Sequence, residues 1–435
     1  MPAAPHDASP GLLDQRQVTL AVAFSALGWS FDLFDLFVLL YVAPALAHVF
    51  FASGRPMLSL AGVYAAFTAT LLMRPAGGWV FGRYSDRRGR RRAMRVAALG
   101  VGVATALMGA LPTVQSVGLL APVLFVSLRL VQGVFMGGMV ASTHTLGTES
   151  IAARRRGLAS GIISGGGSGV GKLVASLVFL LVSALFPGRL YLEWGWRVMF
   201  FSGLLSSMLG LLVFSRVQES PLWEALQRSA APAPAAPRPG LGGFAPTMLL
   251  CVVLTGAGGG LSYLTSGYLP TFLKLVNHVP PRSLGLMLSV SALGVIGASV
   301  LAGHLSDVLG RRPAMLLYGA ASLLLLPLLY LGLEHAVSPL WVGGCAVLLS
   351  ALGTFAYAPL MIVLNERFPT AIRASGTAVS WNIGFALGGS MPVLVSLLAH
   401  DPGGLVGALG LCIAVLAGAY LLAAWCVPAR RNRMA

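Results

Sequence analysis

Gly82-Arg83-Tyr84-Ser85-Asp86-Arg87-Arg88-Gly89-Arg90-Arg91 and Gly303-His304-Leu305-Ser306-Asp307-Val308-Leu309-Gly310-Arg311-Arg312 are two copies of one charged segment. The glycines, the aspartate and the arginine pair stand at the same offsets in both copies, which lie about 221 residues apart. Each copy follows one long apolar stretch and precedes another. A duplicated turn between membrane helices is typical of transporters that are built from two related halves.

The composition of the chain is that of a membrane protein. Of its 435 residues, 57% are hydrophobic and only 10% are charged, and the mean hydropathy is +0.83. Soluble domains carry about 25% charged residues. Apolar runs of about 20 residues, the length that crosses a bilayer as a helix, recur from end to end. We therefore predict an all-α membrane protein with about twelve transmembrane helices in two pseudo-symmetric halves of six.

A proline- and alanine-rich segment separates the two sets of apolar runs. Residues 229–240 read Ser-Ala-Ala-Pro-Ala-Pro-Ala-Ala-Pro-Arg-Pro-Gly, a composition that favours an extended linker without a core of its own. The predicted organisation is an N-terminal tail at 1–17, a first half at 18–216, a linker at 217–243, a second half at 244–427 and a C-terminal tail at 428–435.

The positive charge of the chain is concentrated in alternate loops. A net charge of +16 would suit nucleic-acid binding, but the placement of the arginines indicates membrane topology instead. Loops of this kind stay in the cytoplasm and face anionic lipid, so we expect both termini on the inner side of a bacterial cytoplasmic membrane and no nucleic-acid partner. The arginines concerned are Arg83, Arg87, Arg88, Arg90, Arg91, Arg92, Arg95, Arg154, Arg155, Arg156, Arg311, Arg312, Arg367, Arg373, Arg430, Arg431 and Arg433.

Two acidic residues lie in the middle of the first apolar run. Asp32 and Asp35 are three residues apart, so a helix places them on one face. Ionisable groups at membrane depth are costly and usually functional. Repulsion between the carboxylates and poor hydration both favour a protonated carboxyl, which proton-coupled transport requires. We expect Asp35 to carry the proton and Asp32 to be partnered or to face the substrate. The alternatives are a structural pair with a buried arginine, or a water-filled vestibule around both.

Lys172 lies inside the fifth apolar run of a chain that otherwise uses arginine. It and Lys274 are the only lysines among 29 basic residues. A lysine at membrane depth needs an anion, a vestibule or the neutral state. We expect Lys172 to be the counter-ion of an anionic substrate, and the alternative is a structural ion pair with Asp32 or Asp35.

Several polar and aromatic residues are further candidates for substrate contact. Trp381 and Asn382 stand on the eleventh run, and Tyr263 and Tyr268 stand on the seventh. Each carries a hydrogen-bonding group, although aromatic residues in membrane helices mostly pack or lie at the interface. The sequence has no Walker loop and no metal-ligand cluster, so it predicts no enzymatic activity, no cofactor, no metal and no use of ATP.

The first charged segment resembles the signature between helices 2 and 3 of the major facilitator superfamily. Other stretches are similar to the metabolite:proton symporters of that superfamily, which include carriers of sialate, lactate, dicarboxylates, shikimate and betaines. These stretches are Met73-Arg74-Pro75-Ala76-Gly77-Gly78, Arg129-Leu130-Val131-Gln132-Gly133-Val134-Phe135-Met136-Gly137-Gly138 and residues 366–376, followed by Asn382-Ile383-Gly384. Two positions depart from the pattern, because Met139 replaces a common glutamate and Val308 replaces a common arginine.

The resemblance implies roles for residues of these motifs. Arg129, which we place near the beginning of the fourth span, corresponds to an arginine that supports proton coupling or substrate binding. The alternative is an arginine that extends from the helix end to the membrane surface. The charged segments are implied to form a cytoplasmic gate that holds the outward-open state. Its residues are Gly82, Asp86, Arg87, Gly89, Arg90, Arg91 and Glu149 in the first half, and Gly303, Asp307, Arg311, Arg312 and Glu366 in the second.

Together these inferences predict a monomeric secondary transporter whose partners are a small molecule, protons and lipid. The main hypothesis is proton symport of a small organic anion, with carboxylates as first candidates, by rocker-switch alternating access at the bilayer midplane. Antiporters of the superfamily commonly carry Gly-Pro in span 5, and the absence of proline there before Pro187 favours symport. The alternatives are proton-antiport efflux of drugs or metabolites, and a membrane sensor that does not transport.

Overall fold

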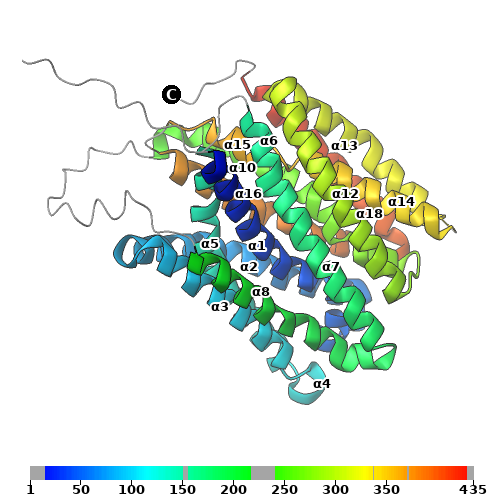
Figure 1. Ribbon diagram of the computed structural model, residues 1–435. Helices are drawn as coiled ribbons and strands as arrows, with labels where there is room; N and C mark the ends of the chain where they lie inside the picture. The colour runs from blue at the N-terminus through cyan, green and yellow to red at the C-terminus, as the bar shows by residue number, and fades with distance from the viewer. Residues whose placement is uncertain (1–14, 150–154, 217–240, 337, 370–371, 429–435) are drawn as a thin grey trace, which may run out of the picture.

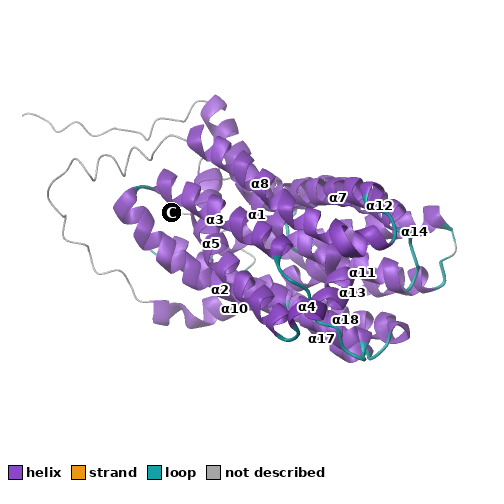
Figure 2. Cartoon of the chain, turned by 90° about the horizontal axis from the view of Figure 1, so that it is seen from below, coloured by secondary structure: helices purple, strands orange, loops and turns teal. Residues whose placement is uncertain are grey.

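The computed structural model describes residues 15–149, 155–216, 241–336, 338–369 and 372–428. Throughout these ranges the regular structure is helical, with no strand (Figure 2). Twelve helical segments of the described chain are long and apolar enough to cross a membrane, six before residue 217 and six after residue 240. The predicted fold class, an all-α membrane protein of about twelve spans, is confirmed.

The first six spans consist of long helices and of short elements that extend them. Pro56 opens α2 at a position where the missing N–H of proline costs no helical hydrogen bond. The fifth span is one continuous run of α6, the π-helix η2 and α7. The elements are α1 (Gln15–Phe50), α2 (Pro56–Arg88), α3 (Arg90–Ala110), α4 (Val114–Val117), α5 (Leu120–Glu149), α6 (Arg156–Ser160), η2 (Gly161–Gly166), α7 (Gly167–Leu185), η3 (Tyr191–Gly195) and α8 (Trp196–Arg216).

The second six spans are built in the same way. Pro281 and Pro339 open α12 and α14, and a π-helix interrupts the seventh span between α10 and α11. The elements are η4 (Leu241–Phe244), α10 (Ala245–Ser262), η5 (Tyr263–Gly267), α11 (Leu269–Leu275), α12 (Pro281–Val308), α13 (Arg311–Glu334), α14 (Pro339–Phe355), α15 (Leu360–Asn365), α16 (Arg373–Gly389), α17 (Met391–Ala399), η6 (Pro402–Gly404) and α18 (Leu405–Cys426).

The two charged segments form the same turn in both halves. Gly89 separates α2 from α3 with φ of 89° and ψ of 149°. Gly310 separates α12 from α13 with φ of 93° and ψ of 160°. A side chain would clash with the backbone at these angles, whereas glycine adopts them readily. The repeated glycine therefore marks an equivalent helix-to-helix turn in each half.

The two sets of helices lie side by side along a shared seam. In Figure 1 the first set runs from blue to green and the second from yellow-green to red. Along the seam α7 packs against α12, and α2 packs against α16 and α17. Within the first set α1 is enclosed by α2, α5, α7 and α8, so its middle is almost entirely buried. This enclosure places Asp32 and Asp35, in the middle of α1, deep inside the protein.

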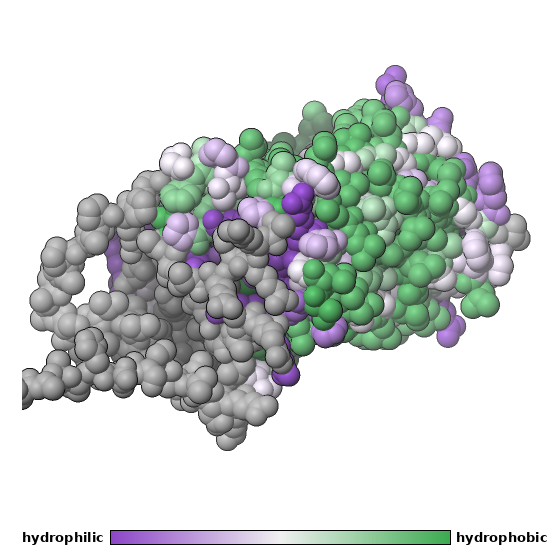
Figure 3. Space-filling model, turned by 90° about the horizontal axis from the view of Figure 1, so that it is seen from above, coloured by the Kyte–Doolittle hydropathy of each residue, from purple (hydrophilic) through white to green (hydrophobic). Residues whose placement is uncertain are grey.

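The outside of the bundle is apolar, as a lipid environment requires. Large hydrophobic side chains, such as Leu72, Leu205 and Val415, are more than half exposed, and Figure 3 shows apolar residues covering much of one face. Many arginines lie at helix termini at one end of the bundle, which we call the arginine-rich end. We call the other end of the bundle the opposite end. The arginines of that end include Arg87, Arg88, Arg92, Arg155, Arg156, Arg311, Arg312, Arg367 and Arg373.

Small residues bring α2 and α5 into backbone contact. Gly133 faces the backbone of Thr70, and Gly137 faces the backbone of Arg74. A Cβ atom at Gly137 would also lie only 2.8 Å from the backbone nitrogen of Gly78. Small residues allow membrane helices to approach in this way. The contact fixes the position of Arg74 along the axis of α5.

We predict that Gly137→Val lowers the free energy of unfolding by about 1–3 kcal/mol, because the added branches overpack the contact between α2 and α5. Gly418→Val is the matched control, since nothing lies within 4 Å of a Cβ atom at that position. The measurement is thermal unfolding of both purified variants in detergent. Equal unfolding midpoints would contradict the close approach of the two helices.

Candidate functional site

Asp32 and Arg74 form a buried ion pair between α1 and α2. Nη2 of Arg74 donates to both carboxylate oxygens of Asp32, at 2.8 and 2.9 Å. The side chain of Asp32 is 2% exposed, and that of Arg74 is 1% exposed. The guanidinium also stands over the ring of Phe385, on α16, at 5.6 Å from its centre. Asp32 is thus a partnered carboxylate, and its partner touches the second half of the molecule.

Asp35, one helical turn further along α1, has hydroxyl partners. Thr105 of α3 donates to Oδ1 at 3.1 Å, and Ser206 of α8 donates to Oδ2 at 3.3 Å. Asp35 is 1% exposed, and within the described part of the chain no cation lies at ion-pair distance from its carboxyl. Asp35 is therefore buried without an ion pair, in contrast to Asp32.

Arg129 lies deep inside α5, which corrects its predicted place near the start of the fourth span. The helix begins at Leu120, and the side chain of Arg129 is fully buried, so it does not extend to the membrane surface. Its guanidinium stands over the rings of Phe125 and Phe200, at 5.5 and 5.6 Å. These aromatic faces, together with Gln132, hold the charge in the interior.

A chain of hydrogen bonds connects Arg129 to Asp35. Nη1 of Arg129 donates to Oε1 of Gln132 at 2.7 Å, and Nε2 of Gln132 donates to Oγ1 of Thr105, also at 2.7 Å. Thr105 then donates to Asp35. The direct pair of Arg129 with an aspartate of the first span, which its charge made plausible, is replaced by two intervening polar side chains.

Lys172 of α7 is buried without an anion. Its side chain is 2% exposed, and Nζ has no hydrogen-bond partner among the residues that the structure describes. The ammonium group stands 4.9 Å from the ring centre of Phe37. The ion pair with Asp32 or Asp35 is not formed, since Asp32 binds Arg74 and Asp35 binds hydroxyl groups. A cation–π contact replaces only part of the lost hydration, so the hydrogen-bonding capacity of Nζ is left open to a further partner.

An aromatic cluster joins α1 to helices of the second half. Nε1 of Trp29 donates to the hydroxyl of Tyr357 at 3.1 Å, and Trp29 packs edge-on against Trp381 at 5.6 Å between ring centres. Trp381 stacks on Phe385 at 5.3 Å. Phe385 also meets Tyr263 at 5.2 Å. The rings form a wall along the seam, beside the ion pair of Asp32.

Three predicted substrate contacts of the second half carry a polar atom without a hydrogen-bond partner among the described residues. Nε1 of Trp381, the hydroxyl of Tyr263 and Oδ1 of Asn382 have no hydrogen-bond partner in the described ranges. The three residues are at most 8% exposed. Buried polar groups are normally satisfied. A bound molecule or water that supplies the missing hydrogen bonds would account for all three.

Tyr268, the fourth aromatic or amide candidate, instead takes part in a contact between the halves near the opposite end. Its ring stacks on that of Tyr64 at 5.1 Å, and its hydroxyl shares a hydrogen bond of 3.0 Å with Ser396. Tyr64 shares a hydrogen bond of 2.7 Å with Thr271 across the seam. The hydroxyl of Tyr268 is therefore already satisfied.

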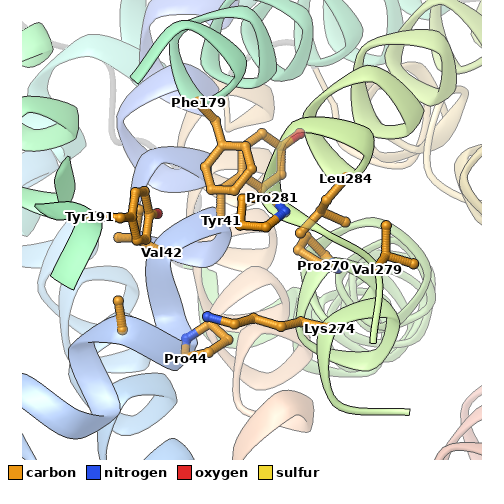
Figure 4. A pocket seen from close by; sticks show the side chains of 11 residues that line it. Tyr41, Val42, Pro44, Phe179, Tyr191, Pro270, Lys274, Val279, Pro281 and Leu284 are labelled. Carbon is orange, nitrogen blue, oxygen red and sulfur yellow. The ribbon is translucent and has the colours of Figure 1, made fainter. Parts of the chain in front are cut away.

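A small cavity lies between the halves at the same end (Figure 4). Its volume is about 10 Å³, room for one water molecule. Tyr41 lines it and donates to the backbone oxygen of Lys172 at 3.3 Å. Figure 4 shows Lys274 extending from α11 toward Pro44 of α1. The cavity is too small for a metabolite.

The second charged segment binds the first half at the arginine-rich end. Asp307 accepts hydrogen bonds from the backbone N–H groups of Gly157 and Leu158, at 2.9 and 2.8 Å, where α6 begins. Arg311 donates to Asp307 and to Glu366, each at 2.9 Å. A carboxylate at a helix N-terminus satisfies N–H groups that lack helical partners. This cluster connects the two halves.

Other residues of the predicted gate lie around this cluster. Gly303 allows α12 to approach α6, because a Cβ atom there would meet the backbone oxygen of Gly157. Arg312 stands over the ring of Trp425 at 4.5 Å. It therefore packs against α18 and differs in its contacts from Arg311.

The first charged segment is described only in part. Gly82 and Arg87 are exposed near the end of α2, and Gly89 forms the turn to α3. The side chains of Asp86, Arg90, Arg91 and Glu149 lie outside the part of the structure that is described. Their gating role stays a prediction.

Four residues of the interior network, Arg74, Thr105, Gln132 and Ser206, were not among the predicted site residues. Arg74 is an ionisable residue in an apolar run, and the depth argument that selected Asp32 would also have selected it. Thr105 and Gln132 are ordinary polar residues in membrane spans. Nothing in their local sequence distinguishes them from residues that only pack.

The comparisons with known proteins agree with this architecture. The model of the family described as Major Facilitator Superfamily matches residues 18–391 and residues 248–434. The chain therefore belongs to the major facilitator superfamily. It is a multi-pass inner-membrane transporter of metabolites and not an enzyme.

Curated relatives cover nearly the whole chain. It is 30% identical to the inner membrane metabolite transport protein YhjE of Escherichia coli (strain K12), over 92% of this chain and 91% of that protein. It is 27% identical to the proline/betaine transporter of the same strain, over 90% and 79%. It is 28% identical to the alpha-ketoglutarate permease of that strain, over 88% and 88%.

Solved structures share the fold at lower identity. The xylose transporter XylE from E. coli, in a partially occluded inward open conformation, superposes with a TM-score of 0.70. The match covers 97% of this chain and 100% of that chain at 19% identity. Such a likeness establishes the arrangement of the helices.

We predict that Arg74→Met lowers the free energy of unfolding by about 3–5 kcal/mol, because it leaves the carboxylate of Asp32 buried and unpaired. The double variant Asp32→Asn/Arg74→Met should recover most of this loss. The measurement is unfolding in detergent of the double variant and of both single variants, which completes a double-mutant cycle. Additive effects of the two single substitutions would contradict a direct pair.

Proposed function

We propose that the chain imports a small organic anion together with protons, by alternating access to a site between its two halves. Carboxylates are the first substrate class to test. The arginine-rich end faces the cytoplasm in this proposal, since arginine-rich loops stay on that side. The second charged segment then belongs to the cytoplasmic gate, and the transporter works as a monomer.

The contrast between the two aspartates of α1 carries the proposal. Asp32 is neutralised by Arg74, whereas Asp35 is buried with hydroxyl partners. Protonation of Asp32 would leave the charge of Arg74 unpaired in the interior, which is costly. Asp35 can gain and lose a proton without breaking an ion pair. We therefore assign the coupling proton to Asp35.

Positive charge for an anion is available in the first half. Lys172 has no hydrogen-bond partner on Nζ among the described residues, and Nε and Nη2 of Arg129 have none there either. Free polar atoms of Trp381, Tyr263 and Asn382 stand on the second half. An anion between these groups would be held by both halves, as a substrate of an alternating-access transporter must be.

The coupling of an anion to protons has an electrostatic advantage. Protons that enter with the anion reduce or reverse the net charge moved, so the membrane potential opposes uptake less. Alpha-ketoglutarate, proline and betaine, the compounds in the names of two relatives, all carry a carboxylate. That shared group supports a carboxylate as the feature recognised in this chain.

The test is uptake into proteoliposomes with an acidic exterior. The radiolabelled panel contains alpha-ketoglutarate, other mono- and dicarboxylates, sialate, aromatic acids, proline and betaine. We expect one class to accumulate and the accumulation to collapse when a protonophore is added. Proton-driven extrusion of apolar dyes, with no accumulation of the panel, would identify an efflux antiporter instead. Inactivity in both assays would favour a membrane sensor.

We predict that Asp35→Asn abolishes proton-driven accumulation, because an amide cannot take up and release the proton. Exchange of substrate between two compartments at equal pH should continue, since it requires no net proton movement. Asp401→Asn is the control, because Asp401 is exposed and only caps η6. Undiminished accumulation by Asp35→Asn would exclude Asp35 from the mechanism.

For Lys172→Met we predict that the KM for the transported anion rises about 10–100-fold, the loss expected for one hydrogen bond to a charged group. Lys172→Arg keeps the positive charge and should lose less. The measurement is the initial rate of uptake as a function of substrate concentration. An unchanged KM in the methionine variant would make Lys172 a structural residue.

A further inference from the structure

The hydroxyl of Thr105 lies between two competing acceptors. Its Oγ1 is 3.1 Å from Oδ1 of Asp35 and 2.8 Å from the backbone oxygen of Val101. A hydroxyl has one hydrogen and two lone pairs. Thr105 can therefore donate fully to Asp35 or to Val101, but not to both at once.

The direction of the remaining bonds to Thr105 is fixed by Arg129. A guanidinium only donates, so the amide oxygen of Gln132 must face Arg129 and the amide nitrogen must face Thr105. This donation from Gln132 occupies one lone pair of Thr105. One lone pair and one hydrogen are left for Asp35 and Val101.

The position of Thr105 is set by its methyl group. A Cβ atom at Gly203 of α8 would lie 2.6 Å from Cγ2 of Thr105, so only glycine leaves the present space for this side chain. Ser206, one turn further along α8, donates to the other oxygen of Asp35. Helices α3, α5 and α8 therefore determine where the hydroxyl stands relative to α1.

This geometry gives the hydroxyl two settings. An ionised Asp35 only accepts, so Thr105 donates to it. A protonated Asp35 carries an O–H that needs an acceptor, and Thr105 offers its remaining lone pair once its hydrogen turns to Val101. Both settings give Asp35, Thr105 and the amide nitrogen of Gln132 a hydrogen-bond partner, and the change requires only rotation about the C–O bond of Thr105.

We propose that Thr105 is a positioning residue for the proton site, a hydroxyl that donates to Asp35 when the carboxyl is ionised and accepts from it when the carboxyl is protonated. The inference rests on the proposed function, which assigns the coupling proton to Asp35. Gln132 transmits the fixed orientation of Arg129 to this hydroxyl. The network thereby keeps Asp35 hydrogen-bonded in both protonation states without water.

No charged side chain among the described residues hydrogen-bonds to Asp35 in place of Thr105. On α1 the neighbouring charge is Asp32, which is paired with Arg74 of α2. On α5 it is Arg129, which acts through Gln132. Helix α8 contributes Ser206 and Gly203, and Lys172 of α7 stands over Phe37. No other titratable side chain of the described residues interacts with Asp35.

The experiment is an infrared pH titration of the purified full-length protein in lipid, which needs no substrate. The carboxyl C=O band that disappears in Asp35→Asn reports the protonated Asp35. In Thr105→Val we expect the band to persist to a pH higher by about one unit, because hydrogen bonds to charged groups are stronger than those to neutral groups. Thr105→Ser restores the hydroxyl and should restore the midpoint.

The controls separate this role from a structural one. Thr255 of α10 is equally buried, and its hydroxyl has no hydrogen-bond partner within the described ranges, so Thr255→Val should leave the midpoint unchanged. If Thr105→Val cannot be purified as a folded protein, Thr105→Ala removes the same hydroxyl with a smaller side chain. That variant should move the midpoint in the same direction.

The outcomes distinguish the two proposals. If no titrating band depends on Asp35, the assignment of the proton fails and the role of Thr105 fails with it. If a band depends on Asp35 but has the same midpoint in Thr105→Val and in the unsubstituted protein, only the role of Thr105 is overturned. A shift in Thr105→Val that Thr105→Ser does not reverse would also overturn it, because the methyl contact and not the hydroxyl would then be responsible.

Discussion

The ion pair between Asp32 and Arg74 is the constraint on which the interior of the protein depends. Both groups are almost completely removed from water, so neither is tolerated without the other and the register of α1 against α2 is fixed. The glycines of α5 hold α2 at the same height. Arg74 in turn meets Phe385 across the seam. The guanidinium of Arg74 therefore neutralises Asp32, and it also contacts the second half of the molecule.

The hydrogen-bond network of Asp35 belongs entirely to the first half. Thr105, Gln132, Arg129 and Ser206 stand on α3, α5 and α8, and none of their bonds to one another or to Asp35 crosses the seam. The aromatic wall, in contrast, lies on the seam and leaves polar atoms of the second half unsatisfied. The hydrogen bonds of Asp35 thus stay within the first half, while the second half carries polar atoms without a partner among the described residues.

The fold could be predicted from the sequence because the bilayer imposes a minimum length on each apolar run and a cost on each buried charge. The same two rules identified Asp32, Asp35 and Lys172 as interior residues. They could not decide between Arg74 and Arg129 as the partner of Asp32, because that depends on which helix α1 faces at each level. Thr105 was beyond prediction for a related reason, since its importance comes from neighbours on three other helices.

Asp307 belongs to the second half, yet the helix that it caps begins the fifth span of the first half. In the proposed alternating-access cycle, separation of the halves at the arginine-rich end would remove this carboxylate from the N–H groups of Gly157 and Leu158, which would then bind water instead. The first turn of the span would then fray in one state of the cycle and stay wound in the other. Local order at Gly157 would thereby become a measure of the transport state, visible as a change in amide hydrogen exchange.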